Sequence, residues 1–382
     1  MNAAATPDSG PVIVGLSGGV DSAVAALLLV ERGFEVQGLF MSNWDEADAY
    51  CTQAEDFQDA RAVARVLDIP LHRVNFAAQY RARVFDYFLA ELKAGRTPNP
   101  DVLCNREVKF GVALRHARRL GASHFATGHY ARLRPVAAGV ELLKSVDAEK
   151  DQTYFLHAVQ PADLHYACMP VGDFTKAQVR ERARAAGLPV FDKPDSTGIC
   201  FIGERPFREF LRQYLDETPG PIESPDGQRL GTHCGLPFYT LGQRGCLGIG
   251  GRHDSEAAPW YVAAKDTARN VLVAVQGHEH PLLCARELHC ENLHWLIPPP
   301  TGPRRCTVRV RHRHADQSAL LRPGADGTAQ VLFDEPQRAL TPGQFAVAYD
   351  GDLCLGGGTI CAVGSGPRPG STRFEARAPL QQ

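Results

Sequence analysis

The sequence predicts an α/β fold in which an N-terminal parallel-sheet domain precedes a small β-rich central domain and a C-terminal β-barrel. Strands alternate with helices in the first half, Pro and Gly punctuate short runs after about Glu204, and short strands with turn signals continue from about His280. A length of 382 residues suits two or three domains. We expect domains at 1–205, 206–278 and 279–364, followed by a disordered tail at 365–382.

Apolar runs that are typical of buried parallel strands alternate with helical segments in the first half. The expected strands span 11–16, 34–41, 71–76 and 124–127, and the expected helices span 23–32, 53–67, 79–94 and 109–120. The last clear helix is at 207–214, and short apolar runs follow at 237–240 and 260–263. The expected barrel strands are at 305–311, 318–321, 329–333, 344–349 and 353–361.

Charge and hydropathy exclude two classes of protein. The 41 Lys and Arg against 43 Asp and Glu give a net charge of −2, which excludes a wholly basic nucleic-acid binder but not a local basic patch. The longest apolar run, residues 23–30, is far shorter than the roughly 18 residues of a membrane span. Residues 1–10 lack the features of a signal peptide. We therefore expect a cytoplasmic protein with no membrane partner.

A tight polar turn with the sequence Ser17-Gly18-Gly19-Val20-Asp21-Ser22 joins the first expected strand to the first expected helix. Glycines let backbone N–H groups turn toward one anion, and a helix N-terminus adds partial positive charge. The two Ser hydroxyls suit phosphates, and Asp21 suits Mg²⁺. Neither the Walker A pattern nor the dinucleotide fingerprint occurs here. The turn therefore predicts a distinct kind of phosphate-binding loop.

The order of residues in this loop resembles that of the PP-loop ATP pyrophosphatases, a Rossmann-like superfamily of the adenine nucleotide alpha hydrolase type. The resemblance implies that ATP is split between its α and β phosphates and that AMP is placed on a carbonyl-type oxygen. A loop around the β,γ-pyrophosphate would stabilise this leaving group.

Two of the eleven cysteines lie in segments with turn chemistry. Cys104 is the next-to-last residue of the Pro-rich stretch 97–105, which we expect to be a loop before a helix at Lys109. Its acidic neighbour Asp101 opposes ionisation of the thiol, whereas a nearby helix N-terminus favours it, and the sequence leaves the balance open. Cys200 lies in a second expected loop at 195–204. We expect the other nine thiols to be small buried apolar groups.

Five motifs in order resemble the bacterial tRNA-specific 2-thiouridylases of the MnmA type. They are GRTPNPDVLCN (95–105), ATGHYAR (126–132), KDQTYFL (150–156), DSTGICFIGE (195–204) and TPGQ (341–344), and the resemblance extends from about residue 12 to residue 361. It implies a tRNA-uridine 2-sulfurtransferase that uses ATP to replace the C2 oxygen of the wobble uridine, U34, in tRNAs for Lys, Glu and Gln. The products would be 2-thiouridine, AMP and pyrophosphate.

The resemblance also implies roles for individual residues. Cys104 is the nucleophile and Cys200 carries the persulfide. Asp101 is the only acid in 99–105, and we assign it the proton transfers, in competition with a turn-capping role. The implied ATP-binding residues are Gly15, Leu16, Ser17, Gly18, Gly19, Val20, Asp21, Ser22, Met41 and Gly128. Asn99, Pro100 and Asp101 would face the target base, and the other implied tRNA contacts are His129, Lys150, Asp151, Gln152, Arg311, His312 and Gln344.

The chemistry suits two thiols. A uridine C2 oxygen leaves only after adenylation, and the terminal sulfur of a persulfide on Cys200 is the nucleophile that expels AMP. Cys104 then breaks the remaining S–S bond by thiol–disulfide exchange, which leaves a Cys104–Cys200 disulfide for a cellular reductant. The implied cofactors are ATP, Mg²⁺ and persulfide sulfur. The expected partners are the anticodon loop of tRNA and a sulfur-relay protein that donates persulfide, and we expect a monomer.

The stretch RCTVRVRHRH (305–314) suggests an RNA-facing strand. Alternation would place Val308, Val310 and His312 on one face and Arg309, Arg311 and Arg313 on the other. We expect the Arg row to suit an RNA backbone, although a solvated basic face would look the same. His312 stands where the family has Tyr, and an inward-pointing His312 would not contact tRNA.

Two other classes of function stay open at this point. A PP-loop ligase or amidotransferase would adenylate a small carboxylate or a cytidine and would not need Cys200. An iron–sulfur RNA-binding protein would take Cys104, Cys200 and Asp101 as three cluster ligands. A cluster-dependent sulfurtransferase would combine this second alternative with the main hypothesis.

Overall fold

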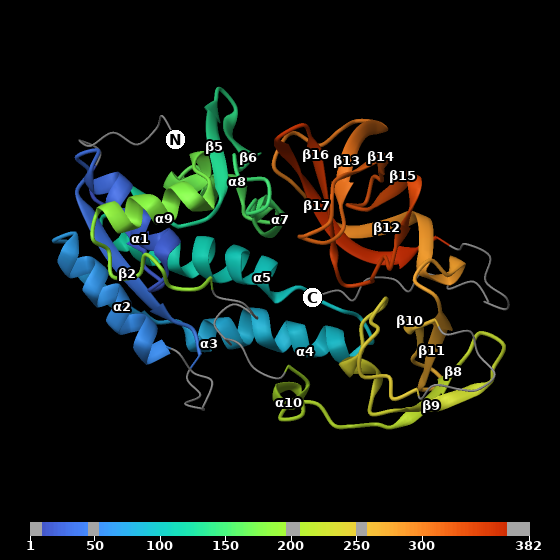
Figure 1. Ribbon diagram of the computed structural model, residues 1–382. Coiled ribbons are helices and arrows are strands. Elements are labelled where there is room, and N and C mark those ends of the chain that lie inside the picture. Colours follow the sequence, from blue (N-terminus) through green and yellow to red (C-terminus); the bar gives the residue numbers. More distant parts are fainter. Residues whose placement is uncertain (1–9, 45–52, 196–206, 250–257, 365–382) are drawn as a thin grey trace.

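The structure is a computed structural model that describes residues 10–44, 53–195, 207–249 and 258–364. The expected persulfide residue, Cys200, and the expected tail at 365–382 lie outside the described residues. The described chain forms an N-terminal α/β part, a small central sheet and a β-barrel (Figure 1). This architecture confirms the predicted fold class.

A five-stranded parallel sheet is the centre of the N-terminal part. Its strands, in spatial order, are β3 (Leu71–Asn75), β2 (Val36–Ser42), β1 (Val12–Gly15), β4 (His124–Ala126) and β7 (Ala167–Cys168). All four residues of β1 are buried, because helices cover both faces of the sheet. The carboxyl ends of these strands share one edge, and the loops that follow them meet there.

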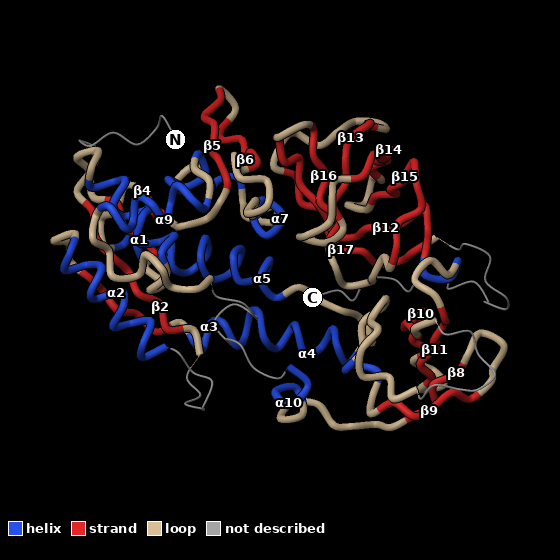
Figure 2. The backbone as a smooth tube through the Cα atoms, in the orientation of Figure 1, coloured by secondary structure: helices blue, strands red, loops and turns tan. Residues whose placement is uncertain are grey.

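Helices form a layer on each face of this sheet (Figure 2). One layer contains α1 (Val20–Val30), α2 (Gln53–Val66) and α9 (Lys176–Ala185). The other contains α3 (Ala77–Tyr80), η2 (Arg81–Phe85), α4 (Asp86–Lys93), α5 (Pro100–Leu103), η3 (Cys104–Ala113) and α6 (Leu114–Arg119). The sequence predicted the helical segments of these two layers except for α9, which it missed, and the start of the α5–η3–α6 helix.

The expectation of a loop over 97–105 with a helix from Lys109 is wrong at its boundary. The helix begins at Pro100 and continues through the π-helical stretch η3, so Cys104 lies inside it. Asn99 is the N-cap, and its side-chain oxygen accepts a hydrogen bond from the backbone N–H of Asp101 at 3.1 Å. An Asn cap followed by Pro at the first helical position is a helix start signal, because Pro has no N–H to leave unsatisfied there.

The central part is a four-stranded sheet with the order β10-β11-β8-β9. Its strands are β8 (Gly220–Glu223), β9 (Arg229–His233), β10 (Trp260–Asp266) and β11 (Val271–Gln276). The short run at 237–240 is not a strand: the Pro-containing segment forms the 3-10 turn η5 (Leu236–Phe238). The helix α10 (Phe207–Leu211) precedes this sheet and packs its Phe210 against Trp44 of the N-terminal part.

Six strands of the C-terminal part form a barrel that the pairing of β12 with β17 closes. They are β12 (Cys284–Trp295), β13 (Arg304–Arg309), β14 (Gln317–Pro323), β15 (Ala329–Arg338), β16 (Phe345–Asp350) and β17 (Leu353–Val363). The hairpin of β5 (Ala131–Val136) and β6 (Gly139–Lys144), which the sequence analysis missed, joins the barrel sheet through Leu143 opposite Leu353. This pairing attaches the N-terminal part to the barrel.

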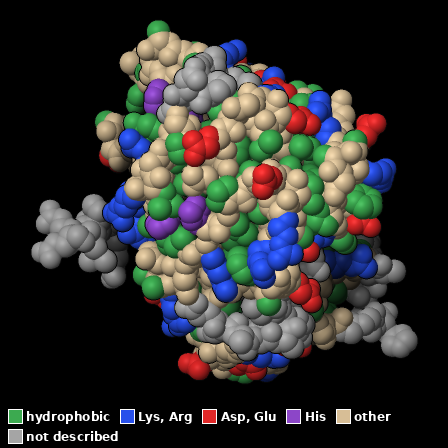
Figure 3. All heavy atoms as spheres, turned by 90° about the vertical axis from the view of Figure 1, so that its left-hand side faces the viewer, with side chains coloured by type: hydrophobic (Ala, Val, Ile, Leu, Met, Phe, Trp, Pro, Cys, Tyr) green, Lys and Arg blue, Asp and Glu red, His purple; other side chains and the backbone are tan. Residues whose placement is uncertain are grey.

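The remaining helical elements are short. They are α7 (Thr153–Leu156), α8 (Pro161–Leu164), η4 (Pro170–Asp173) and η6 (Pro281–Leu283). No helix among the described residues is long and apolar enough to span a membrane. On the face that lies to the left in Figure 1, acidic and basic side chains are interspersed (Figure 3), in agreement with the net charge of −2.

Candidate active site

The phosphate loop turns sharply between β1 and α1. Gly18 has φ of +81°, and a Cβ on it would lie 2.3 Å from the backbone oxygen of Asp56, so only glycine fits. The Ser22 hydroxyl donates to the Gly19 carbonyl at 3.0 Å and accepts from the Ser17 N–H at 3.2 Å. Gly19 caps α1 without a side chain, which leaves the first N–H groups of the helix for an anion.

Two further expected ATP-site residues lie at this loop. A Cβ on Gly128 would lie 2.6 Å from the backbone of Asp21 and Ser22, so the turn after β4 packs directly on the start of α1. A Cβ on Gly15 would lie 3.6 Å from the terminal methyl of Met41 at the end of β2. The structure therefore brings these residues together around one helix N-terminus, and their contact with ATP stays a prediction.

A network of charged side chains surrounds Asp21. The ammonium of Lys176, on α9, lies 2.7 and 2.8 Å from the two carboxylate oxygens of Asp21 and 2.7 Å from Asp195. The Tyr130 hydroxyl donates to Asp21 at 2.9 Å, and Lys150 bonds Asp195 at 2.8 Å. Burial alone would raise the pKa of Asp195, but the hydrogen bonds from Lys150 and Lys176 lower it to about 2.

A second lysine lies on the other side of the loop. The ammonium of Lys193 donates to the Gly18 carbonyl at 3.1 Å, to Asp56 at 2.7 Å and to Asp59 at 2.5 Å. Burial lowers the pKa of Lys193, but its hydrogen bonds to the two carboxylates raise it above its ordinary value, so the charge is kept. Two ammonium groups therefore flank a loop that is shaped for phosphates.

Sequence reasoning missed Lys176 and Lys193. Neither belongs to the residues we singled out, because 155 and 172 positions separate them from Asp21. A compositional signal was nevertheless present. Lysine is rare in this chain, with seven among 41 basic residues, and three of the seven, including Lys150, lie at this site. Because the lysine ammonium is a compact point charge, lysines in an arginine-rich chain are candidates for sites that need one.

Cys104 is fully buried and is the first residue of η3. On the same helix, the Lys109 ammonium lies 3.4 Å from the Nε2 atom of His129, which follows Gly128. The Cys104 helix therefore packs beside the turn that contacts the phosphate loop. Asp101 lies in the first turn of this helix, and its carbonyl accepts a hydrogen bond from the Asn105 amide at 3.0 Å.

The segment that carries Cys200 begins directly after Asp195, which three cations hold beside the phosphate loop. Cys200 itself lies outside the described residues. No group of three or more His, Cys, Asp or Glu within the described ranges is arranged to hold a metal ion. The carboxylate of Asp21, together with substrate phosphates, is the kind of oxygen donor set that suits Mg²⁺.

Sequence comparison assigns the chain to a family. The tRNA methyl transferase HUP domain family matches residues 10–204, the PRC-barrel domain of the same group matches 208–276, and the aminomethyltransferase β-barrel domain matches 285–360. The tRNA-specific 2-thiouridylase MnmA of Chromohalobacter salexigens is 55% identical over 91% of this chain and 92% of that protein. The MnmA of Burkholderia thailandensis is 51% identical over 97% and 98%.

The chain belongs to the tRNA-specific 2-thiouridylase MnmA family. This assignment confirms the resemblance seen in the sequence and the expected enzyme class of the family. Solved structures are more distant. A 4-thiouridine synthetase in an RNA complex with bound ATP is 20% identical, with a TM-score of 0.32 over 53% of this chain and 50% of that one. The U34-tRNA thiolase NcsA of Methanococcus maripaludis is 16% identical, with a TM-score of 0.35 over 53% and 63%.

The KDQ segment, Lys150 to Gln152, forms hydrogen bonds with other parts of this protein. Asp151 is 2% exposed and accepts hydrogen bonds from the Arg309 guanidinium and the Thr153 hydroxyl, both at 2.8 Å. The Gln152 side chain accepts the N–H of Tyr130 at 3.0 Å. The motif therefore links the barrel to the residue that bonds Asp21, and the contacts of its side chains with tRNA stay predictions.

His129 is also enclosed. Its Nδ1 atom lies 2.7 Å from the Thr127 hydroxyl. Burial, followed by the charge of Lys109, lowers the pKa of His129 well below its ordinary value, so the ring is neutral at pH 7. The expected tRNA contact of His129 would require the ring to act as a neutral hydrogen-bonding group rather than as a cation.

The expected row of exposed guanidiniums is wrong. Strand β13 ends at Arg309, which is 8% exposed because it lies opposite Asp151 and Asp316, the latter at 2.7 Å. Arg311 is half-buried, and Arg313 is the exposed member of the three. The alternation rule predicted the burial of Val308 and Val310 correctly, but it could not reveal the carboxylates that pair with Arg309.

His312 points toward the N-terminal part and bonds the same residue, Asp151, as Arg309 does, so the alternation that placed these two side chains on opposite faces does not extend past the end of β13 at Arg309. Its Nε2 atom lies 2.9 Å from the carbonyl oxygen of Asp151. Burial lowers the pKa of His312, although the hydrogen bond to that carbonyl opposes the shift. In the described structure this side chain therefore bonds the protein itself, and its expected contact with tRNA stays a prediction.

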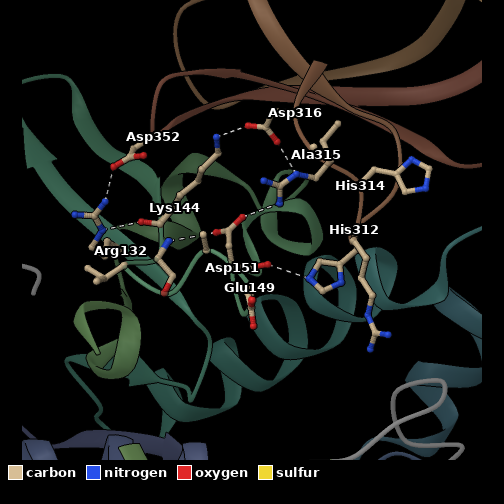
Figure 4. Close-up of a pocket in the computed structure, with 14 residues that line it drawn as sticks. Arg132, Lys144, Glu149, Asp151, His312, His314, Ala315, Asp316 and Asp352 are labelled. Atoms are coloured by element: carbon tan, nitrogen blue, oxygen red, sulfur yellow. Dashed lines mark hydrogen bonds and ion pairs between the residues drawn. The ribbon is translucent and has the colours of Figure 1, made fainter. Parts of the chain in front are cut away.

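A pocket of about 960 Å³ lies between the β5–β6 hairpin, the KDQ segment and the barrel (Figure 4). Several of its charged side chains are paired: Arg132 bonds Asp352 at 2.7 Å, and Lys144 and Arg309 share Asp316. The pairs of Arg132 and Lys144 join the β5–β6 hairpin to the barrel at this pocket.

The expectation for the other cysteines holds in part. Cys168, Cys290 and Cys354 are buried, and burial raises the pKa of Cys168 to about 11 and that of Cys354 to about 12, so these thiols stay protonated. Cys246 and Cys361 are exposed, which contradicts the expectation for those two residues. Cys51 lies outside the described residues.

Proposed function

We propose that this chain adenylates the C2 oxygen of U34 in tRNAs for Lys, Glu and Gln and replaces that oxygen with persulfide sulfur. The observation that carries the proposal is the packing of the Cys104 helix beside the phosphate loop through Lys109, His129 and Gly128. A thiol and a pyrophosphate-binding loop are then parts of one site. The high identity to thiouridylases over nearly the whole chain supports the same conclusion.

Adenylation is the first step. The C2 oxygen of uridine attacks the α phosphate of ATP, the bond between the α and β phosphates breaks, and pyrophosphate leaves. The N–H groups at the start of α1 and the Ser17 and Ser22 hydroxyls bind the phosphates, while Lys176 and Lys193 offset the charge of the leaving pyrophosphate. Asp21 would be a protein ligand for Mg²⁺, which when bound would supply positive charge at the departing phosphates.

Sulfur transfer follows. The terminal sulfur of the Cys200 persulfide attacks C2, and AMP leaves with the original oxygen. The Cys104 thiolate then attacks the Cys200 sulfur, so that the S–S bond to the base breaks with its electron pair on the C2 sulfur and a Cys104–Cys200 disulfide forms. A cellular reductant supplies two electrons to reopen it. Asp101, in the first turn of the Cys104 helix, carries the proton transfers.

Substrate recognition uses the anticodon loop. Unpaired loop bases can be turned out and read along their edges. We propose that Asn99, Pro100 and Asp101 face the base, because they lie at the start of the helix that carries Cys104. The side-chain oxygen of Asn99 is used for capping, so its amide group is the part that can donate to a pyrimidine oxygen. A sulfur-relay protein would load Cys200.

The decisive experiment is mass spectrometry of tRNA nucleosides after incubation of the protein with ATP, Mg²⁺ and a persulfide source. We expect 2-thiouridine from U34, pyrophosphate release that depends on tRNA, and no product from a tRNA with cytidine at position 34. Sulfur at another position of the tRNA would overturn the proposed target. Adenylation of a small carboxylate without any need for tRNA would overturn the proposal in favour of the ligase alternative.

A further inference from the structure

Arg311 and Gln344 bond the protein at every contact that the structure describes, although both were expected to contact tRNA. The Arg311 guanidinium uses one terminal nitrogen to donate to the Leu241 carbonyl at 3.2 Å, the Ala339 carbonyl at 3.0 Å and the Thr341 hydroxyl at 3.1 Å. Leu241 belongs to the central part, whereas the other two acceptors belong to the barrel. Arg311 therefore ties these two parts together.

The turn at 339–344 is packed tightly on the central part. Ala339 has φ of +52°, and a Cβ on Gly242 would lie 2.6 Å from the Ala339 side chain. The Thr341 hydroxyl donates to the Ala339 carbonyl at 2.7 Å, which closes the turn. A left-handed alanine is costly unless its surroundings hold it. Two of the bonds of Arg311, to the Ala339 carbonyl and the Thr341 hydroxyl, hold this turn, and the third joins it to Leu241 of the central part.

The C-terminal end of the turn, at Pro342 and Gln344, is hydrogen-bonded to Thr97. The Thr97 N–H donates to the Pro342 carbonyl at 2.9 Å, and the Gln344 amide donates to the Thr97 carbonyl at 2.8 Å. Gly343 has φ of +92°, and a Cβ on it would lie 2.8 Å from the Thr97 nitrogen. Both backbone groups of Thr97 are therefore bonded to the barrel turn.

Thr97 lies two residues before Asn99, the cap of the helix that contains Asp101 and Cys104. Whatever fixes Thr97 fixes the entry of the chain into that helix. Figure 1 shows the start of α5 directed toward the junction of the barrel and the central sheet. A close contact supports this placement, because a Cβ on Gly95 would lie 2.7 Å from the Thr267 methyl of the central part.

We propose that Arg311 and Gln344 are positioning residues, which hold the 339–344 turn as a strut between the central sheet and the entry to the Cys104 helix. The strut sets where the base-facing residues and the nucleophile lie. Neither side chain needs to contact RNA for its removal to impair sulfur transfer. The effect of the two residues on catalysis rests on the proposed function. Their effect on the position of the helix start does not depend on that function.

The structural part is tested without RNA, by hydrogen exchange in the full-length protein. Gln344→Met keeps the side-chain length, Arg311→Met keeps an unbranched apolar stem, and both remove the donors. We expect both variants to raise exchange at the Thr97 N–H by at least about 10-fold. Arg311→Lys keeps one nitrogen with three hydrogens, so it should restore protection. Arg322→Met, an exposed arginine on β14 of the same barrel, is the control and should change nothing at Thr97.

The catalytic part is tested with tRNA. For both Met variants we expect the tRNA KM and the salt dependence of tRNA binding to stay close to wild type, while kcat for thiolation falls about 10-fold to 100-fold. A direct phosphate contact would instead lower the salt slope by about one. Unchanged exchange at Thr97 with a lower slope would overturn the proposal. If the wild-type protein does not thiolate tRNA, the proposed function fails. The exchange experiment still shows whether Arg311 and Gln344 hold the chain at Thr97.

Discussion

The ammonium of Lys176 lies within hydrogen-bonding distance of both carboxylate oxygens of Asp21, at 2.7 and 2.8 Å. The acid of the phosphate loop thus carries a cation before any nucleotide arrives. The same ammonium also bonds Asp195 at 2.7 Å, so one lysine is shared between two carboxylates. A cation held at the edge of a phosphate loop in this way is poised for a third anion, and Lys176 is the residue that we expect to meet the pyrophosphate.

Replacement of Lys176 by Met should therefore impair adenylation. The variant removes a charge that offsets the developing charge of the leaving group, and we expect a loss in the rate of pyrophosphate release of about 100-fold. The measurement is release of labelled pyrophosphate from ATP in the presence of tRNA. Arg182→Met on the same helix α9 is the matched control, because Arg182 is paired with Glu31 at the surface. Equal rates of pyrophosphate release in the two variants would show that Lys176 does not act on the leaving group.

The two-thiol scheme separates the chemical steps. Cys104→Ala should abolish 2-thiouridine formation while pyrophosphate release continues, because adenylation precedes the step that needs this thiol. Cys200→Ala should do the same. Both products are measured in one reaction, by nucleoside mass spectrometry and by pyrophosphate release. Cys361→Ala, which replaces an exposed thiol of the barrel, should thiolate at the wild-type rate. A Cys104→Ala protein that still forms 2-thiouridine at the normal rate would refute the scheme.

Local signals in the sequence were sufficient for much of the fold. The apolar run of β1, the Gly-Gly turn and the helix after it are neighbours in the chain, and their geometry follows from short-range rules. The start of the Cys104 helix was misplaced although Asn99 and Pro100 are a helix start signal. The other proline of this stretch, Pro98, and its polar neighbours are also typical of a loop, so the two signals compete over the same residues.

Long-range pairing explains the remaining misses. Arg309 looked like an exposed residue because strand alternation says nothing about what lies opposite, and its partner Asp151 is 158 positions away. Lys176 reaches Asp21 across 155 positions for the same reason. Periodicity gives the face on which a side chain lies, whereas only the assembled structure shows the charge that meets it.

The buried pair of Arg309 and Asp151 should matter for stability. Arg309→Met leaves the Asp151 carboxylate, which is 1% exposed, without a cation, and we expect a loss of about 3–5 kcal/mol in the free energy of unfolding. Adding Asp151→Asn should restore most of it, because the buried charge is then gone. Urea unfolding measures both. Arg305→Met, which breaks an exposed pair with Asp334, should cost less than about 1 kcal/mol. No recovery in the double variant would show that the charge is not the cause.

The pH dependence of stability should carry a contribution from His157. This ring is fully buried and donates from Nδ1 to the Tyr154 carbonyl at 2.7 Å. Burial lowers the pKa of His157 to about 4, although that hydrogen bond opposes the shift. Between the folded value and the ordinary value of about 6.5, the unfolded chain binds more protons than the folded chain. The free energy of unfolding therefore rises with pH through this window. The contribution of His157 to stability is lost as the pH falls from 6.5 toward 4.

The size of this contribution is on the order of 3 kcal/mol at pH 7, since each unit of pKa is about 1.4 kcal/mol. His157→Asn keeps a donor near the Nδ1 position and does not titrate, so its unfolding free energy should fall less steeply between pH 6.5 and 4 than that of the wild type. Urea unfolding at a series of pH values measures the difference. His165→Asn removes an exposed histidine and should follow the wild-type curve. If both variants give the wild-type slope, the buried ring does not govern the acid sensitivity, and other buried groups must.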